Sequence, residues 1–490
     1  MRSLLAILTV AILTSACATR FENHPLAAGQ SNPERRTVDV SQQDRPLILV
    51  AFSGGGSRAA ALGWVVLREL RKYSYIAASG ASRPLIDDIA VISSVSGGSV
   101  IAAHFALEGP QGLDNFEPEF LAQDNTRALG AEALSPLRLI TGASRSDLVE
   151  ELFDRQLFGH KTFAALNQPG KPYLILNATD MASGEVFGFT PQRFDDICSD
   201  LDTQAISTGV AASAAVPVAF TPVSFINYSY VDSTDYCRQR PIPQWVANRL
   251  DPVKGRYAPY LNVDQFKLAR YANDLRNGPS QFRQIQYLYF MDGGLADNLA
   301  LHGLMETVAS PFAAPIVAPP AEQGGPSTTI LRAVNEGRVR KLAVIMVNAR
   351  ADPASDIYKN PDRPGIFGMI KSVTSLPIDS ASAGVKNQMD ALLAQYKGFP
   401  GAPAIYDIEL DFDQLRVADP EQRALRDQAK EIPTLWTITK PNLEVIDKVG
   451  MLLLHQHPCF QRLLDDLAIP ASFVDRDYAR RGCAQTTDRH

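Results

Sequence analysis

Short runs of consecutive apolar residues mark the first strands that the sequence predicts. Residues 46–52 (Pro-Leu-Ile-Leu-Val-Ala-Phe) and 89–92 (Ile-Ala-Val-Ile) are continuous apolar runs. Such runs are typical of strands buried on both faces of a sheet. Each run leads through a turn rich in Gly and Ser into a helical pattern, over residues 58–72 and 99–107. The repeated order of strand, tight turn and helix predicts a layered α/β core.

The same reasoning extends the sheet along the chain. Further strands are expected at residues 173–177, 186–189, 286–291, 341–347 and 404–410, and helices near 380–397 and 442–456. The expected fold class is therefore α/β, with a central, mostly parallel sheet between two layers of helices.

Composition and pattern divide the 490 residues into segments. We expect a signal peptide at 1–16, a polar tether at 17–45 and a catalytic domain at 46–350. That domain carries a polar, aromatic insertion at about 228–285, and residues 351–490 form an extension of unknown role. Hydrophobic residues make up 46% and charged residues 20%, which excludes a mainly disordered chain.

The N-terminus has the pattern of an export signal. Arg2 precedes an apolar run over residues 4–13, which is too short to span a hydrocarbon core of about 30 Å. The following Thr14-Ser15-Ala16-Cys17 resembles a bacterial lipobox, although Thr14 replaces the usual Leu. The resemblance implies a lipid-anchored Cys17, with Ala18 fitting outer-membrane sorting toward the periplasm or cell surface. Cleavage after Ala18 and simple secretion is the alternative.

Four further cysteines and the charge balance limit the chemistry. An even number of cysteines in an exported chain suggests two disulfides. Loop-closure entropy favours the short pairings Cys198–Cys237 and Cys459–Cys483, and buried free thiols are the alternative. No spacing indicates a metal site, and no cofactor is expected. A net charge of −6 offers no electrostatic footprint for nucleic acid.

Ser94-Val95-Ser96-Gly97-Gly98 lies between a predicted strand and a predicted helix. A nucleophile elbow needs such a sharp turn, with small residues two positions on either side of the nucleophile. The elbow would place the Ser96 hydroxyl at a helix N-terminus, where free amides stabilise negative charge. A helix-capping turn is the alternative.

A glycine loop, Ser53-Gly54-Gly55-Gly56-Ser57-Arg58, follows the first strand. Three glycines let consecutive amides turn toward one point, which suits an oxyanion. The loop also matches a dinucleotide-binding pattern, but the second strand ends in Ser93-Ser94 instead of the acidic residue that a ribose requires. A third motif, Asp292-Gly293-Gly294, follows a later strand and alone indicates only a turn.

Together these motifs resemble the patatin-like phospholipases. The Gly-Gly-Gly-x-Arg loop, the serine elbow and the downstream Asp-Gly-Gly stand in that family's order. Two more blocks agree, Asn177-Ala178-Thr179-Asp180 and residues 211–217, which are similar to the family's Ala-Ser-x-Ala-x-Pro segment. Asn298 stands where such proteins often carry Asn. The resemblance covers residues 46–350.

The resemblance implies a serine lipid acyl hydrolase, of the phospholipase A or lysophospholipase type, that acts on lipid at a membrane surface. Ser96 would be the nucleophile and Asp292 its base in a Ser–Asp dyad, and an acyl-enzyme would form. Gly54, Gly55, Gly56 and Arg58 would provide the oxyanion hole, with Arg58 either shaping the loop or adding positive potential. An Asp at its ordinary pKa of about 3.9 is a weak base for this step.

Two alternatives remain from the sequence. A Ser-His-Asp esterase would need a histidine near the elbow, and His104, His160 and His302 are the nearest in sequence to the motifs. A lipoprotein that kept the fold but binds lipid without hydrolysing it is the other.

Overall fold

We describe the fold from a computed structural model of the chain. The structure describes residues 21–32, 38, 40, 45–133, 144–217, 219–231, 233–251, 263–278, 284–308, 326–351, 366–397, 401–416, 418–469 and 476–485. The predicted signal peptide at 1–16 and Cys17 lie outside these residues. None of the described helices is long and apolar enough to cross a membrane.

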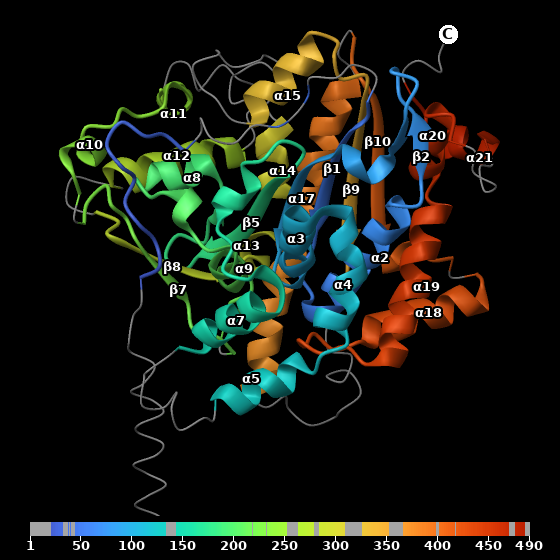
Figure 1. Cartoon of the computed structure of the whole chain (residues 1–490), viewed down its shortest axis with the longest axis horizontal. Coiled ribbons are helices and arrows are strands. Elements are labelled where there is room, and N and C mark those ends of the chain that lie inside the picture. Colours follow the sequence, from blue (N-terminus) through green and yellow to red (C-terminus); the bar gives the residue numbers. More distant parts are fainter. Residues whose placement is uncertain are drawn as a thin grey trace, which may run out of the picture.

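The centre of the molecule is one mixed sheet (Figure 1). Its strands run in the order β10-β9-β1-β4-β5-β8-β7, and β6 pairs with β5. The five strands from β10 to β5 are parallel, whereas β8 runs antiparallel to both β5 and β7. The strands are β1 (Leu47–Phe52), β4 (Ile89–Val95), β5 (Tyr173–Asp180), β6 (Val186–Gly188), β7 (Val223–Ile226), β8 (Tyr287–Asp292), β9 (Lys341–Asn348) and β10 (Ala404–Asp411). A separate hairpin joins β2 (Ser74–Ile76) to β3 (Ser82–Pro84).

Helices fill the connections between the strands. The α-helices are α2 (Gly56–Leu70), α3 (Gly97–Glu108), α4 (Leu113–Phe116), α5 (Asn125–Ala133), α7 (Arg145–Phe153), α8 (Pro191–Asp196), α9 (Ile206–Ser213), α10 (Asp235–Arg238), α11 (Gln244–Leu250), α12 (Val263–Asn277), α13 (Gly294–Asp297), α14 (Leu301–Val308), α15 (Pro326–Asn335), α17 (Ile366–Lys397), α18 (Pro420–Glu431), α19 (Lys440–Gln456), α20 (Pro458–Asp466) and α21 (Arg476–Gly482). Short 3₁₀ and π turns are η2 (Leu85–Asp88), η3 (Gly109–Gly112), η4 (Glu117–Leu121), η5 (Asp154–Phe158), η6 (Phe163–Leu166), η7 (Leu201–Thr203) and η10 (Phe412–Gln414).

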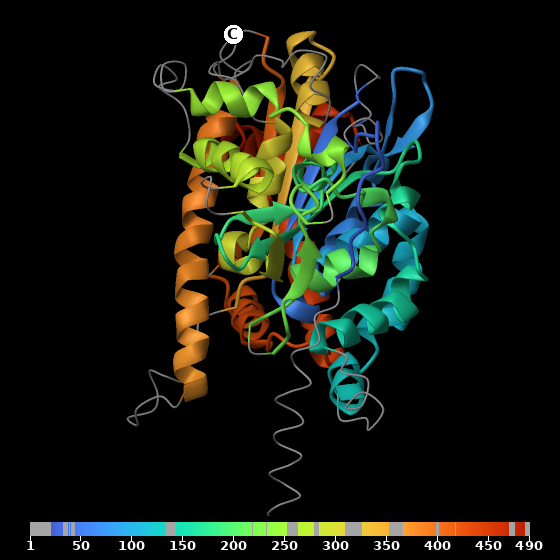
Figure 2. The same ribbon diagram turned by 90° about the vertical axis from the view of Figure 1, so that its left-hand side faces the viewer.

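Two hydrophobic cores cover the two faces of the sheet. In β1, Ile48, Val50 and Phe52 enter the core shared with α2, α3, α9 and α19. The alternate residues Leu49 and Ala51 enter the core shared with α14, α15 and α17. Because successive side chains of a strand point to opposite faces, a continuous apolar run is what a doubly covered strand requires. Figure 2 shows the long α17 along one flank, with the sheet between it and the opposite helical layer. The predicted three-layer architecture is confirmed.

The parallel strands define a carboxyl edge, at which β1, β4 and β5 all end. The helices α2 and α3 begin directly at this edge, after the glycine loop and the serine elbow. The antiparallel β8 begins past the end of β5 and runs back toward the carboxyl edge. Its last residue, Asp292, therefore lies opposite Ala178 near the end of β5. The topology therefore brings all three motifs to one edge.

The extension after residue 350 is part of this domain. β10 pairs with β9 over eight residues in parallel register, and α19 packs against α2. The helix expected near 380–397 begins much earlier, at Ile366. Because β10 and α19 bury apolar side chains in the same core as β1 and α2, the extension is neither a separate domain nor an exposed tail.

The tether predicted at 17–45 is wrong for residues 21–32. The Asn23 amide donates to Ser199 Oγ (3.1 Å) and to the Ile226 carbonyl (2.8 Å), and the Asn32 amide donates to the Ser199 carbonyl (2.8 Å). Leu26 is buried in a small apolar cluster. The polar side chains of this stretch form hydrogen bonds with buried backbone groups. Composition alone cannot distinguish such side chains from polar side chains that face solvent.

Two disulfides hold peripheral segments, Cys198–Cys237 and Cys459–Cys483. These are the short pairings that loop closure favours. The first joins the loop after α8 to α10, within the region predicted as an insertion. The described parts of that region are largely helical (α10, α11 and α12), although the sequence shows little helical period there.

We predict that replacing Cys459 and Cys483 together by Ser lowers the free energy of unfolding by about 3 kcal/mol, because the bridge closes a loop of 24 residues. Urea denaturation of the oxidised proteins measures the difference. An unchanged midpoint with an unchanged slope would contradict the prediction.

Candidate active site

Ser96 occupies a strained turn between β4 and α3. Its backbone has φ 52° and ψ −124°, a conformation rare for a residue with a side chain. Its neighbours must be small, since a Cβ at Gly97 would lie 2.0 Å from the Gly56 carbonyl oxygen. A Cβ at Gly98 would lie 2.6 Å from the Ser53 carbonyl oxygen. These contacts explain the two glycines and give the turn the geometry of a nucleophile elbow.

Asp292 meets Ser96 at the end of β8. The Ser96 hydroxyl donates a hydrogen bond to its carboxylate, and the Gly294 amide donates another to Asp292 Oδ1 at 2.8 Å. Burial raises the pKa of the Asp292 carboxyl from 3.8 to about 6, although both hydrogen bonds act in the opposite direction. The sequence-based view of Asp292 as a base of ordinary pKa is therefore wrong. A carboxylate with a raised pKa is a better proton acceptor near neutral pH.

A network of hydroxyl and backbone groups fixes the two partners relative to each other. The Ser96 amide donates to Ser213 Oγ (2.9 Å), and Ser213 Oγ donates to the Asn177 carbonyl (2.7 Å). The Gly293 amide donates to the Ser213 carbonyl (3.0 Å), and Thr179 Oγ1 donates to the Asp292 carbonyl (2.9 Å). Ser213 thus links the elbow, β5 and the Asp-Gly-Gly turn. The sequence marked its segment only as a family block, and no local pattern gives it this role.

The glycine loop presents free amides beside the elbow. Gly54 faces Ser96, because a Cβ there would lie 3.3 Å from the Ser96 Cβ. Its own amide, however, donates to the Asn298 carbonyl (3.1 Å). The amides of Gly55, Gly56 and, in the elbow, Gly97 have no hydrogen-bond partner within the described residues. Of the predicted oxyanion-hole glycines, Gly55 and Gly56 therefore remain available as donors.

Arg58 is buried and points away from the dyad, toward the C-terminal extension. Its Nε donates to the Ala349 carbonyl at 2.8 Å, and its Nη1 donates to the Ile432 carbonyl. Nη2 is 3.4 Å from Thr434 Oγ1. Burial lowers the pKa of the Arg58 guanidinium to about 10, so the side chain stays protonated at neutral pH. Of the two roles that the sequence left open, this geometry supports shaping the loop.

A strap of residues 432–437 closes over the glycine loop. The Ser57 amide donates to the Leu435 carbonyl (2.8 Å), and that carbonyl oxygen would lie 2.4 Å from a Cβ at Gly56. Trp436 packs edge-to-face on Phe153, with 5.0 Å between ring centroids. The strap comes from the extension whose role the sequence left unknown, and sequence reasoning missed it.

The histidines named from the sequence lie in other contacts. His104 Nε2 is 2.9 Å from the Gly112 carbonyl oxygen, and its ring packs on Phe116. His160 pairs with Asp154 (2.6 Å), and His302 pairs with Asp297 (3.2 Å). The structure thus places a carboxylate, and none of these three rings, against Ser96. No group of three or more metal-ligating side chains occurs within the described residues.

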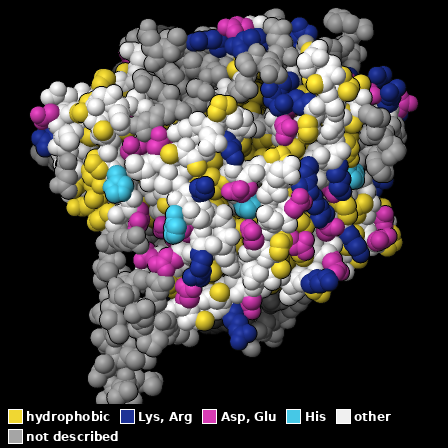
Figure 3. Space-filling view, in the orientation of Figure 1, with side chains coloured by type: hydrophobic (Ala, Val, Ile, Leu, Met, Phe, Trp, Pro, Cys, Tyr) yellow, Lys and Arg dark blue, Asp and Glu magenta, His cyan; other side chains and the backbone are white. Residues whose placement is uncertain are grey.

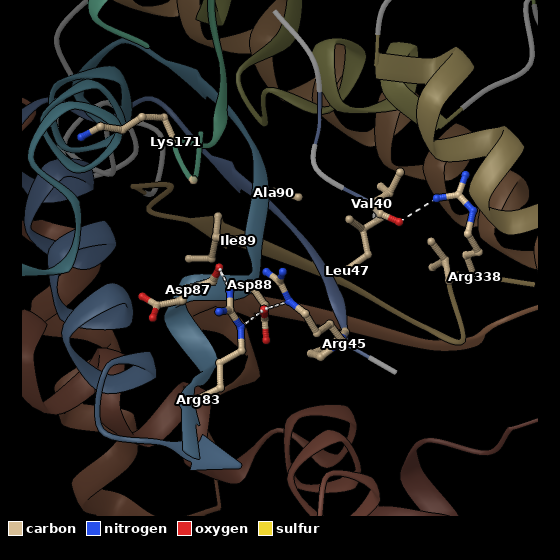
Figure 4. A pocket seen from close by; sticks show the side chains of 13 residues that line it. Val40, Arg45, Leu47, Arg83, Asp87, Asp88, Ile89, Ala90, Lys171 and Arg338 are labelled. Carbon is tan, nitrogen blue, oxygen red and sulfur yellow. Dashed lines mark hydrogen bonds and ion pairs between the residues drawn. The ribbon is translucent and has the colours of Figure 1, made fainter. Parts of the chain in front are cut away.

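A cavity of about 260 Å³ lies at the opposite edge of the sheet, where β1 and β4 begin (Figure 4). Figure 4 shows Arg45 and Arg83 reaching toward the buried Asp88, while Lys171 extends away from them. The Nε atoms of the two arginines lie 2.8 Å and 2.7 Å from Asp88 Oδ1. This ion-paired cluster lies at the sheet edge opposite to the one that holds Ser96 and Asp292.

The fold and the site together define an α/β protein with a serine elbow, a carboxylate partner and a glycine loop at one sheet edge. A family model described as patatin-like phospholipase matches residues 50–234. Residues 50–234 thus match the patatin-like phospholipase family, which the sequence motifs also resemble. The matched segment includes Ser96 and ends before Asp292. A search of curated proteins finds no match for this chain.

Solved structures of human GIVD cytosolic phospholipase A2 are similar to the chain. One has 13% sequence identity and a TM-score of 0.41, and the match covers 86% of this chain and 60% of the human chain. A complex of the human protein with methyl gamma-linolenyl fluorophosphonate has 13% identity and a TM-score of 0.40, covering 86% and 59%. The present chain thus spans about three fifths of that human protein.

We predict that kcat/KM for ester hydrolysis rises with pH and levels off above an apparent pKa near 6. With Asp292 as the base for Ser96, its carboxyl must be ionised to accept the proton, so protonation below this value would remove the base. A pH profile with a non-ionisable ester measures it. A midpoint near 4, about the ordinary value for Asp, would contradict the prediction.

We also predict that Gly56→Ala lowers kcat about 100-fold, because the new Cβ would meet the Leu435 carbonyl and displace a candidate oxyanion donor. Gly159→Ala is the matched control: Gly159 has φ 54°, close to the 60° of Gly56, and open space around it. Both variants place a side chain on a residue with a similar positive φ. Equal losses of kcat in the two would assign the effect to strain alone.

Proposed function

We propose that this protein is a lipid acyl hydrolase that cleaves phospholipid or lysophospholipid esters through Ser96 and Asp292. The observation that carries the proposal is the hydrogen bond from the strained Ser96 to a buried carboxylate whose pKa is raised to about 6. The patatin-like phospholipase domain supports lipid ester as the substrate class.

In the acylation step, Ser96 Oγ attacks the ester carbonyl while Asp292 accepts its proton. The developing oxyanion is stabilised by amides of the Gly55–Gly56 turn and of Gly97, at the N-terminus of α3. The leaving alcohol takes the proton from Asp292, and the acyl group remains on Ser96 as an ester.

In the deacylation step, Asp292 accepts a proton from water, which attacks the acyl-enzyme. Collapse of the second tetrahedral intermediate releases the fatty acid and returns the proton to Ser96. The same carboxylate thus acts as base and acid in turn, which a pKa near neutrality allows.

We further propose that the protein is exported and held at a membrane by lipid on Cys17. The N-terminal apolar run and the lipobox-like Thr14-Ser15-Ala16-Cys17 support this address. An anchor would keep the enzyme at the surface where its lipid substrate lies. Mass spectrometry of the mature N-terminus tests it, and an unmodified terminus at Thr19, after cleavage behind Ala18, would contradict it.

The function itself is tested by hydrolysis of dispersed phospholipid with wild type, Ser96→Ala and Asp292→Asn. We expect Ser96→Ala to lose at least about 1,000-fold in kcat and Asp292→Asn at least about 100-fold. A fluorophosphonate probe should label Ser96 in the wild type. Equal background rates in all three proteins would instead support a lipid-binding protein without activity.

A further inference from the structure

Large apolar side chains that are exposed to solvent gather at the carboxyl edge of the sheet. Nine such side chains occur in the part of the chain that the structure describes, and six of them lie at this edge. These six form what we call the apolar rim: Phe21, Met181, Val216, Tyr287, Tyr289 and Leu435.

Four members of the rim form a continuous group beyond the end of β5. Met181 directly follows β5, and its amide donates to the Tyr289 carbonyl (2.8 Å). Tyr287 and Tyr289 are two residues apart on β8, so they share a face, while Leu288 and Phe290 point into the core. Phe21 stacks on Tyr287, with 5.3 Å between ring centroids.

The other two members flank the dyad. Val216 follows Ala215, whose carbonyl accepts the Asp292 amide (2.9 Å). Leu435 lies on the other side, where its carbonyl accepts the Ser57 amide (2.8 Å). Members of the rim thus lie at the outer end of β8, beside the turn that holds Asp292 and beside the glycine loop, so they flank the site.

Solvent exposure of this many large side chains in one region marks an interaction surface. The exposed fractions are 37% for Phe21, 40% for Tyr287 and 56% for Met181. Tyr is enriched where proteins meet the headgroup level of a membrane, because its ring is apolar and its hydroxyl stays hydrated. Figure 3 shows hydrophobic side chains along the left-hand edge, at the height of β7 and β8 in Figure 1.

The start of the described chain identifies the partner. Phe21 is packed on the rim, and Cys17 precedes it by four residues. Four residues of fully extended chain reach at most about 14 Å, so the proposed lipid on Cys17 would have to lie within about that distance of Phe21. A lipid anchor on Cys17, as proposed above, would therefore hold the surface around Phe21 close to the membrane.

We propose that the apolar rim docks on a lipid bilayer and turns the Ser96–Asp292 site toward it. The benefit of docking for catalysis rests on the proposed hydrolase function, whereas docking itself needs no hydrolysis. The ester would then reach Ser96 from the membrane side, without crossing bulk water.

Ile76 provides a matched control. It is the most exposed of the nine side chains, at 69%, and lies on β2 after α2 has returned to the opposite edge of the sheet. Tyr289→Trp and Ile76→Trp each add one fluorescent reporter to the protein, in addition to the native Trp64, Trp245 and Trp436. Both are made in the full chain with Ser96→Ala, so that no lipid is hydrolysed.

The measurement is quenching of tryptophan fluorescence by phosphatidylcholine vesicles with doxyl-labelled acyl chains. We expect the quenched fraction contributed by the Tyr289→Trp reporter to exceed that of Ile76→Trp by at least about threefold. Both proteins carry the same N-terminus, so the anchor alone would give equal quenching, and that result would overturn the proposal. A dimer that shields the Tyr289→Trp reporter before vesicles are added would also overturn it.

A second measurement uses the Ser96 enzyme. Tyr287→Ser combined with Tyr289→Ser should lower the rate on phosphatidylcholine vesicles about fivefold, and the rate on a monomeric short-chain ester by less than about twofold. Ile76→Ser should change neither rate. Equal losses on both substrates would overturn docking, whereas quenching without any hydrolysis would refute only the proposed function.

Discussion

The hydrogen bond between Ser96 and Asp292 depends on strand direction. Ser96 follows a strand that ends at the carboxyl edge, whereas Asp292 ends a strand that arrives from beyond that edge. Only an antiparallel neighbour of β5 can bring its last residue to the level of the elbow while its first residues extend past it. The reversal of β8 in an otherwise parallel sheet thus sets both the dyad and the position of the tyrosines beyond it.

The environment of this hydrogen bond decides its chemistry. In water a serine hydroxyl and an Asp of ordinary pKa would exchange almost no proton. Burial raises the pKa of Asp292, and in the proposed mechanism the amides of Gly55, Gly56 and Gly97 stabilise the charge that appears on the substrate oxygen. The backbone of Ser96 is strained in this arrangement. The Ser213 hydroxyl helps to hold it there by accepting a hydrogen bond from the Ser96 amide.

The sequence predicts the strands and the three-layer fold from local pattern, whereas the pairing of Ser96 with Asp292 beside the glycine loop is implied only by the resemblance of the motifs to a family. Prediction from the sequence fails where the role of a residue depends on a contact with a residue that is distant in the sequence. Leu26 and Asn32 look like tether residues until the carbonyls they meet are known. Likewise, the residues next to Asp292 in the sequence do not show that burial raises its pKa. The residues next to Arg58 do not show that its side chain points toward Ile432.

The bond from Arg58 to Ile432 joins residues 374 positions apart. Synthesis must therefore reach residue 432 before the glycine loop can gain this support, and a chain truncated before that residue lacks it. The contact with Ile432 is made by the C-terminal fifth of the chain, so that part of the chain is needed to complete the packing around the glycine loop.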